Sequence, residues 1–545
     1  MKCRGILYTD PFIQRTGRPP LSLFQSYNTM STQIFLMPFF VFLLPSLYLL
    51  LLRQRKKPDQ PKIRLPPGPR KLPLVGNLHQ LGNMPHRSFQ RLSAEYGPLM
   101  FLQLGLIPTL IVSSADMARE IFKTHDRVFS GRPVLYAAKR LSYNLCAVSF
   151  APYGNYWREV RKIVILELLS AKRVQSFQSV RDEEVAHMLD SVSLSSGPVN
   201  LSELALSLAN NVVCLVAFGK KYDGGGSDSE SGVYQNLRKT QDLLGGFCIA
   251  DFFPWMGWLN KFNGLEERVE KNFRQLDEFY EKVIEEHRSS KPENDEDLVA
   301  VLLRIQEDSN QELPLHIDQI KAVLTDMFIA GTDTSSATIV WIMSELIRNP
   351  SVMQRAQVEV REIVKGKQKV EESDLLKLIY LKSIVKEGFR LHPPAPLLVP
   401  RETTESCTIE GYHIPAKTRV FFNAKSIGED PKYWKNPKEF RPERFLDSSV
   451  DFRGQHFELL PFGAGRRGCP GIQFATQLIE LALANLLHRF DWEMADGVRR
   501  EELDMEEAVG LTMHKKLLND QRPLRYCHRR HQTETPLLSC RRPLQ

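Results

Sequence analysis

The stretch LLPFGAGRRGCPGIQFA, residues 459–475, combines a single cysteine with a glycine-rich loop and the start of an apolar helix. Glycines surround Cys469, and they permit a tight loop whose amide hydrogens point at one atom. Arg466, Arg467 and the N-terminus of the following helix add positive potential, so the sulfur is predicted to be biased toward thiolate. Such a thiolate is a nucleophile or a soft metal ligand. No histidine stands nearby as a base, which favours the metal ligand.

The spacing of five residues around this cysteine identifies a family. Phe462, Gly465, Arg467, Cys469 and Gly471 form the pattern Phe-x-x-Gly-x-Arg-x-Cys-x-Gly. This pattern resembles the haem-binding signature of the cytochrome P450 family, the haem-thiolate monooxygenases. The resemblance implies haem b, iron protoporphyrin IX, as the cofactor and Cys469 as the iron ligand. It also implies that Phe462 packs beside the sulfur and that Arg467 binds a haem propionate.

A second motif lies in an expected long helix over 315–348. The sequence AGTDTS at 330–335 resembles the oxygen-binding motif of the family. The hydroxyl of Thr334 can bond to the carbonyl of Ala330, four residues back, which loosens the helix and opens a groove. The resemblance implies that Thr334 hydrogen-bonds to oxygen bound at the iron and that Asp333 helps to deliver protons from solvent.

Other motifs match structural and cofactor-binding positions of the family. Glu387 and Arg390 stand three apart on one helix face. Together with Arg444 of the PERF element at 442–445, they are expected to form a buried triad that locks the loop carrying Cys469.

Three further residues are implied as contacts of the cofactor. Trp157 and Arg161 lie four apart on an expected helix, so both can face the cofactor, and Arg401 follows in the segment LLVPRET. Arginine suits a carboxylate through its planar fork. The resemblance therefore assigns these residues to the haem propionates.

The resemblance, strongest to plant microsomal A-type members, implies the reaction. NADPH supplies electrons through NADPH-cytochrome P450 reductase, and one atom of O₂ enters a small lipophilic substrate, such as a specialised plant metabolite. Arg158, Arg161, Lys162 and Arg466 are expected to meet the acidic reductase. The expected substrate pocket is apolar and includes Ala330, Leu397, Leu398, Val399 and Val509.

Two alternatives remain open at this point. One is an oxygen-independent haem-thiolate isomerase or dehydratase, although such relatives usually lack a threonine at the position of Thr334. The other is an inactive haem-binding paralogue.

Composition excludes several other classes of protein. The 545 residues are 42% hydrophobic and 25% charged, which is typical of a globular chain and not of a disordered one. The net charge of +8 resides at the ends: residues 1–64 carry ten basic and two acidic residues, and 515–545 carry eight and two. The remaining residues, 65–514, carry a net charge of −6, which does not suggest a nucleic-acid partner. Eight scattered cysteines without a CxxC pair suggest neither a disulfide scaffold nor a zinc site.

An apolar run of 19 residues without a charge, 34–52, is long enough to cross a bilayer, and basic residues follow it at once. The positive-inside rule then predicts a single-pass anchor with the body in the cytosol. The resemblance to microsomal members implies that the membrane is that of the endoplasmic reticulum. A cleaved signal peptide and a buried core helix are the competing interpretations. We expect an extension of uncertain status over 1–29, the anchor over 30–52, a basic and proline-rich hinge over 53–77, the monooxygenase domain over 78–514 and an atypical basic tail over 515–545.

The body is predicted to be mainly α with a minor β portion, as the P450 fold requires. Apolar periodicity predicts helices over 157–169, 264–289, 315–348, 351–364, 375–391 and 472–490. Alternating segments predict strands over 99–105, 109–114 and within 407–424. Residues 224–232 and 289–297 are expected to be solvated loops. The tail differs from the ending of the family, so the closing strand is expected to be missing.

Overall fold

The computed structural model describes Leu43, 46–48, 64–195, 197–222, 227–289, 297–308, 314–494, 499–508, 510–516 and 525–530. The chain divides into a first unit over 1–64 and a second over 65–545. The predicted anchor over 30–52 lies outside the described residues, apart from Leu43 and 46–48, which are helical. The extension over 1–29 and most of the hinge also lie outside them.

The second unit is mainly helical, as its periodicity predicts. Its α-helices are α2 (Pro85–Tyr96), α3 (Ala115–Thr124), α4 (Tyr136–Leu141), α5 (Asn155–Ile163), α6 (Ala171–Ser176), α7 (Gln178–Leu194), α8 (Leu201–Phe218), α9 (Ser227–Gly245), α10 (Leu259–Phe262), α11 (Leu265–Ser289), α12 (Leu298–Glu307), α13 (Ile317–Arg348), α14 (Pro350–Ile363), α15 (Glu372–Leu375), α16 (Ile379–Leu391), α17 (Ala424–Gly428) and α18 (Ile472–Arg489). Short helical turns include η2 (Val128–Ser130), the π-helical η3 (Val164–Leu168), η6 (Pro442–Phe445), η7 (Gly465–Arg467) and η8 (Arg500–Glu502).

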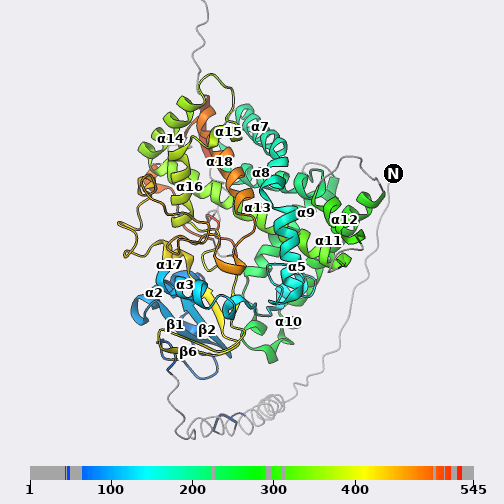
Figure 1. Cartoon of the computed structure of the whole chain (residues 1–545), viewed down its shortest axis with the longest axis vertical. Helices are drawn as coiled ribbons and strands as arrows, with labels where there is room; N and C mark the ends of the chain where they lie inside the picture. The colour runs from blue at the N-terminus through cyan, green and yellow to red at the C-terminus, as the bar shows by residue number, and fades with distance from the viewer. Residues whose placement is uncertain are drawn as a thin grey trace, which may run out of the picture. The chain divides into compact units, whose positions relative to one another are not determined.

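Within the described residues, the β portion forms three small sheets. The largest has the order β1-β2-β7-β4, built from β1 (Leu99–Leu104), β2 (Ile107–Val112), β7 (Arg419–Phe422) and β4 (Arg401–Glu402). Its only parallel pair joins β2 to β7, with Thr109 opposite Arg419. A hairpin joins β5 (Cys407–Ile409) to β6 (Tyr412–Ile414). Figure 1 shows β1 and β2 with α2 and α3 at one end of the body, away from α14 and α18.

The structure corrects the prediction for the tail. The third sheet has the order β3-β9-β8, and its middle strand β9 (Arg525–Arg530) comes from the tail itself. It pairs antiparallel with both β3 (Val199–Asn200) and β8 (Phe490–Met494). The expectation of a missing closing strand is therefore wrong, because backbone pairing does not require the side-chain pattern of the family ending.

Other boundaries also differ from the predicted ones. The helix expected over 157–169 changes at Val164 from α-helix to the π-helical turn η3. The helix expected over 375–391 is split into α15 and α16. Residues 227–232, predicted to be loop, belong to α9, whereas 290–296 lie outside the described residues.

The long helix α13 runs through the centre of the body, and its buried side chains face several neighbouring helices. Gly331 allows a close approach to α8, because a Cβ there would lie 2.8 Å from Cγ2 of Val213. Phe328 and Phe218 extend this contact with ring centroids 5.4 Å apart, edge to face. Helix α8 is long and apolar enough to span a membrane, but 61% of it is buried in the body, which is typical of a core helix.

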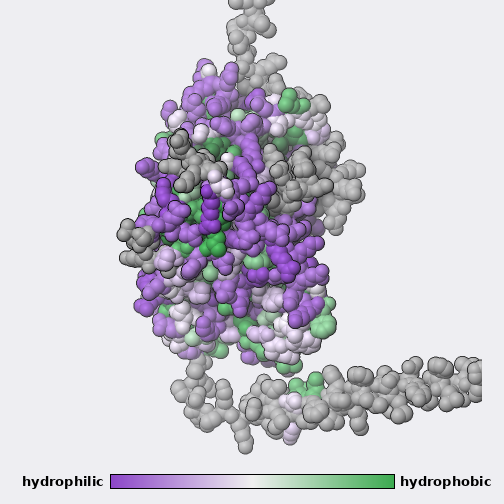
Figure 2. All heavy atoms as spheres, turned by 90° about the vertical axis from the view of Figure 1, so that its right-hand side faces the viewer, coloured by the Kyte–Doolittle hydropathy of each residue, from purple (hydrophilic) through white to green (hydrophobic). Residues whose placement is uncertain are grey.

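A smaller hydrophobic cluster fixes the sheet to the body. Leu110, Val112 and Phe422 on the sheet pack against Ile121 and Phe122 of α3. On the face displayed in Figure 2, most of the described side chains are hydrophilic and the hydrophobic patches are small and separated. The described body thus keeps its apolar groups largely inside.

A buried charge cluster connects α16 to η6. Glu387 is fully buried and pairs with Arg390 Nε at 2.7 Å and with Arg444 Nε at 3.0 Å. Arg390 also donates to the carbonyls of Gly428 and Pro437, each at 2.6 Å. The cluster therefore holds the long connection between α17 and η6. It reaches the cysteine loop through the neighbouring Phe389, whose ring centroid lies 5.0 Å from that of Phe462.

Replacing Glu387 with alanine should abolish stable folding. The change leaves two buried guanidinium groups without their carboxylate, which costs about 3–5 kcal/mol. Chemical denaturation of the purified variant would measure the loss. The matched control is Arg274→Ala, which removes a surface pair with Glu270 and should cost less than about 1 kcal/mol. Equal stabilities of the two variants would contradict this account of the cluster.

Candidate active site

The loop before α18 positions Cys469 by backbone hydrogen bonds. The amide of Cys469 donates to the carbonyl of Phe462 at 3.0 Å, and the amide of Gly471 donates to the Cys469 sulfur at 3.4 Å. Gly465 has a φ of +66°, and a Cβ there would lie 2.3 Å from Oδ1 of Asp126. Only glycine fits at that position without displacing the aspartate. The loop thus presents one sulfur atom at a fixed place.

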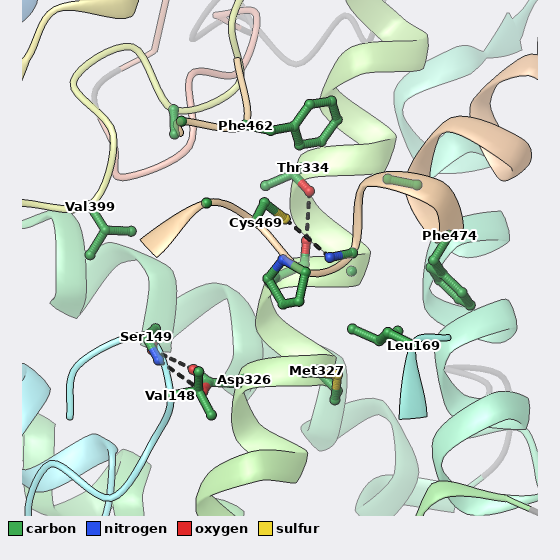
Figure 3. Close-up of a pocket in the computed structure, with 18 of the residues that line it drawn as sticks. Val148, Ser149, Leu169, Asp326, Met327, Thr334, Val399, Phe462, Cys469 and Phe474 are labelled. Carbon is green, nitrogen blue, oxygen red and sulfur yellow. Dashed lines mark hydrogen bonds between the residues drawn. The ribbon is translucent and has the colours of Figure 1, made fainter. Parts of the chain in front are cut away.

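The sulfur lies on the wall of a cavity of about 290 Å³. The wall also contains Ala330, Gly331 and Thr334 of α13. The Thr334 hydroxyl donates to the carbonyl of Ala330 at 2.6 Å, which is the bond that the sequence predicts. Figure 3 shows this bond beside Cys469, with Phe462 and Phe474 nearby. Two sequence motifs about 135 residues apart therefore line one space.

Arginine side chains surround the same cavity. Arg132, Arg161, Arg401 and Arg467 all line it. Burial, together with the repulsion of Arg401 and Arg161, lowers the pKa of Arg467 to about 9. Burial also lowers the pKa of Arg401 to about 10, and that of Arg132 falls well below its usual range for the same reason. The cluster is thus electrostatically costly without an anion.

The partners of these arginines are mostly backbone carbonyls. Arg467 donates to the carbonyls of Ser130, Val148 and Ala151 at 2.6–3.2 Å. Arg161 donates to the carbonyl of Gly468 at 2.6 Å.

Few carboxylates neutralise this charge. Arg401 has one carboxylate contact, at 3.3 Å from Asp126. Arg132 donates from one nitrogen to the carbonyls of Val399 and Pro400, and its buried Nε has no hydrogen-bond partner among the described residues. The Nε–H group of Arg132 therefore remains available to donate a hydrogen bond to a bound carboxylate.

The structure corrects the predicted ionisation of Cys469. Burial raises the pKa of this thiol, and the Gly471 amide and Arg161 only partly offset that effect. The surrounding protein alone therefore does not make the sulfur a thiolate, because desolvation outweighs the nearby positive charge. A bound metal ion deprotonates a coordinating thiol. No histidine lines the cavity in the described part of the chain.

The residues fit an iron porphyrin that carries carboxylate groups. A soft sulfur ligand lies on one wall, cationic donors lacking a matching number of anions surround the cavity, and much of the remaining lining is aliphatic or aromatic. The unpartnered Nε of Arg132 is a specific sign of a missing anionic partner.

Trp157 and Phe462 occupy supporting positions. The indole N–H of Trp157 donates to the carbonyl of Val148 at 3.0 Å, and its ring packs against the Arg467 guanidinium, 4.2 Å from the ring centroid. Trp157 does not itself line the cavity, although Arg161 on the same helix does. Phe462 lines it and packs on Phe389, whereas Gly465 does not line it and is exposed.

The predicted substrate residues are only partly brought together. Ala330, Leu398 and Val399 line the cavity. Leu397 does not, because it packs against a separate hydrophobic cluster around Phe89. Leu397 lies in a turn and Leu398 has a φ of +53°, so neither strand nor helix periodicity predicts which side chains of this segment face the cavity. Val509 lies outside the described residues.

Among the charged residues of the cavity, the sequence analysis assigned no role to Arg132 or Asp326. Asp326 accepts from the Ser149 amide at 3.1 Å and from its hydroxyl, as Figure 3 shows. The helical spacing of 326, 330 and 334, four residues each, was the available signal for Asp326. Nothing around Arg132 in the sequence distinguishes it from a surface arginine.

The expected docking residues do not form one surface. Arg161 turns into the cavity, and burial lowers the pKa of its guanidinium. It therefore does not belong to an exposed docking surface. Arg158, Lys162 and Arg466 remain exposed.

The chain is similar to known proteins over most of its length. A sequence model of the family described as Cytochrome P450 matches residues 66–519. "Cytochrome P450 71A9" of Glycine max is 64% identical, over 88% of this chain and 96% of that protein. "Strychnine-11-hydroxylase" of Strychnos nux-vomica is 57% identical, over 87% of this chain and 94% of that protein. A solved zebra fish cytochrome P450 with abiraterone has a TM-score of 0.70 and 25% identity, covering 83% of this chain and all of that one.

The carboxyl of Asp326 should make stability depend on pH. Burial raises its pKa to about 6 from 3.8, despite the hydrogen bonds from Ser149. The contribution of this carboxyl to the free energy of unfolding is therefore complete below pH ~4 and is lost as the pH rises through about 6. Asp326→Asn cannot ionise. The free energy of unfolding of the wild type, relative to this variant, should fall by about 3 kcal/mol between pH ~4 and ~7.

Denaturant titrations across this pH range would measure the difference. Asp190→Asn is the control, because Asp190 is exposed and pairs only at the surface with Arg489. If the difference in free energy of unfolding between the wild type and Asp326→Asn stays constant with pH, the raised pKa is contradicted.

Proposed function

Because the chain belongs to the cytochrome P450 family and resembles its plant A-type members, we propose that it is a membrane-anchored monooxygenase of small lipophilic metabolites. The observation that carries the proposal is the cavity that joins Cys469, Thr334 and the buried arginines. We propose haem b as the cofactor, with Cys469 as its iron ligand and NADPH as the electron source through a reductase. When bound, haem supplies the activation of O₂.

The protein's own residues would act in three ways. Arg132, Arg161, Arg401 and Arg467 would hold the carboxylates of the cofactor through the donors that face the cavity. The Gly471 amide would hold the sulfur in place. In the same cavity, the oxygen of the Thr334 hydroxyl would accept a hydrogen bond, because its hydrogen is donated to the Ala330 carbonyl.

The substrate would lie against apolar side chains. Met327, Leu398 and Val399 line the cavity, together with Val213 and Val216 of α8. Such a wall favours a lipophilic compound through burial of apolar surface. A relative that is 57% identical carries the name strychnine-11-hydroxylase, so hydroxylation of a specialised plant metabolite is the reaction that we propose.

We propose that the segment 30–52 anchors the protein in the endoplasmic reticulum with the body in the cytosol. The basic residues at 53–57 support this orientation. Glycosylation of Asn200, within the sequon Asn-Leu-Ser, would contradict it, because that modification occurs in the lumen.

The function is tested in two steps. The purified wild type should bind haem and give the carbon monoxide difference band typical of thiolate ligation, whereas Cys469→Ala should lose that band completely. With reductase and NADPH, a panel of lipophilic metabolites that includes strychnine should yield a product heavier by one oxygen atom. A protein without porphyrin would contradict the proposal.

The same experiment separates the two alternatives. Rearrangement of a hydroperoxide without NADPH would indicate an isomerase or dehydratase. A normal difference band without NADPH consumption or product would indicate an inactive haem-binding paralogue. The presence of Thr334 in the cavity supports the monooxygenase over both.

Reductase docking gives a separate prediction. Arg158→Glu with Lys162→Glu should slow reductase-dependent turnover about ten-fold or more at low salt, because both exposed cations face an acidic partner. Turnover driven by an added organic hydroperoxide, which bypasses the reductase, should be unchanged. Lys417→Glu, an exposed change on another part of the body, is the control. Unchanged reductase-dependent turnover in the double variant would exclude this docking surface.

A further inference from the structure

A histidine from the C-terminal segment contacts the acid of the AGTDTS motif. Nε2 of His514 lies 2.9 Å from Oδ1 of Asp333. The His514 side chain is 40% exposed and the Asp333 side chain only 17%. The other oxygen of Asp333, Oδ2, is buried and has no hydrogen-bond partner among the described residues. The pair therefore connects solvent, on the histidine side, to an unused buried acceptor.

The position of Asp333 next to Thr334 indicates in which direction a proton would pass through the contact between His514 and Asp333. Thr334 lines the cavity and donates its hydroxyl hydrogen to the Ala330 carbonyl. Because that hydrogen is already used, a proton required in the cavity must come from another group. Asp333 directly precedes Thr334 in the chain, although Asp333 itself does not line the cavity. Its own supply of protons then depends on what connects it to solvent.

The backbone around His514 is held by specific contacts. The amide of Met513 donates to the carbonyl of Pro394 at 2.8 Å, and the indole N–H of Trp341 donates to the Met513 carbonyl at 2.8 Å. The amide of Ala508 donates to the carbonyl of His514 at 2.8 Å. Met513 is 98% buried. These contacts hold the imidazole over α13, unlike a side chain on an unattached surface segment.

We propose that His514 is a positioning residue that passes protons from solvent to Asp333. This inference rests on the proposed monooxygenase function. A proton from water binds Nδ1 of the imidazole, and the proton on Nε2 moves to the Asp333 carboxylate. Asp333 then releases that proton toward the cavity, and a tautomer exchange restores the imidazole. One proton enters and one leaves, with no change in oxidation state.

The ratio of NADPH to oxygen consumed tests the relay without a known substrate. Hydrogen peroxide forms from one O₂, one NADPH and one proton, whereas two waters form from one O₂, two NADPH and two protons. The haem-loaded full-length protein, with reductase in phospholipid vesicles, should consume more than one NADPH per O₂. His514→Gln should lower this ratio and raise the peroxide fraction several-fold, because an amide hydrogen-bonds but does not relay protons.

Matched variants separate a relay from a structural contact. His514→Arg places a permanent positive charge beside Asp333 and should be as defective as His514→Gln, because guanidinium stays protonated. Asp333→Asn should show the same defect. His413→Gln on β6 should match the wild type. Retention of the wild-type ratio in both His514 variants, or a wild-type ratio of one, would overturn the proposal. Absence of the carbon monoxide band in the wild type would instead overturn the proposed function.

A chemical measurement tests the contact independently of turnover. Diethyl pyrocarbonate modifies exposed imidazole nitrogens, and mass spectrometry locates the modified histidine. His514 should react several-fold faster in Asp333→Ala than in the wild type, because loss of the carboxylate frees Nε2. His413 should react equally in both proteins. Equal reactivity of His514 in the two proteins would overturn the proposal, even if the His514 variants failed to fold.

Discussion

The central constraint in this protein is the burial of positive charge around an apolar cavity. Guanidinium groups at 132, 161, 401 and 467 line one space with a thiol, and their nearest partners are mostly carbonyls. Burying cations without anions is costly, so the arrangement favours a ligand with carboxylate groups. Burial raises the pKa of the Cys469 thiol, and a bound metal ion would favour its thiolate form. The folded chain is thus complementary to an anionic metal cofactor.

The same charges also connect the two sides of the cavity. Arg467, two residues before Cys469, donates to the Val148 carbonyl, while Asp326 on α13 accepts from Ser149. The loop at 148–149 is therefore held between the cysteine loop and the central helix. A change in either anchor would move a wall of the substrate cavity as well as a contact of the cofactor. The loop therefore contacts both the cysteine loop and α13.

The buried charge cluster that stabilises the fold is separate from the residues that line the cavity. Glu387 and its two arginines do not line the cavity, and the neighbouring Phe389 connects them to the cysteine loop by packing on Phe462. The C-terminal segment contributes in two ways, since β9 completes a sheet and His514 reaches Asp333. A tail whose sequence differs from that of the family thus still takes part in the fold.

The sequence alone determined the features that depend on neighbours in the chain. The spacing around Cys469, the Thr334 bond to Ala330 and the amphipathic helices all follow from local geometry, because residues three or four apart share a helix face. The family also followed from such spacing. Only the tertiary structure decided which distant segments meet: Arg132 and Asp326 enter the cavity, Leu397 leaves it, Arg161 turns inward and His514 contacts Asp333. These outcomes depend on packing between segments up to several hundred residues apart. The burial of a side chain there depends on its neighbours in space, which the local periodicity of the sequence does not predict.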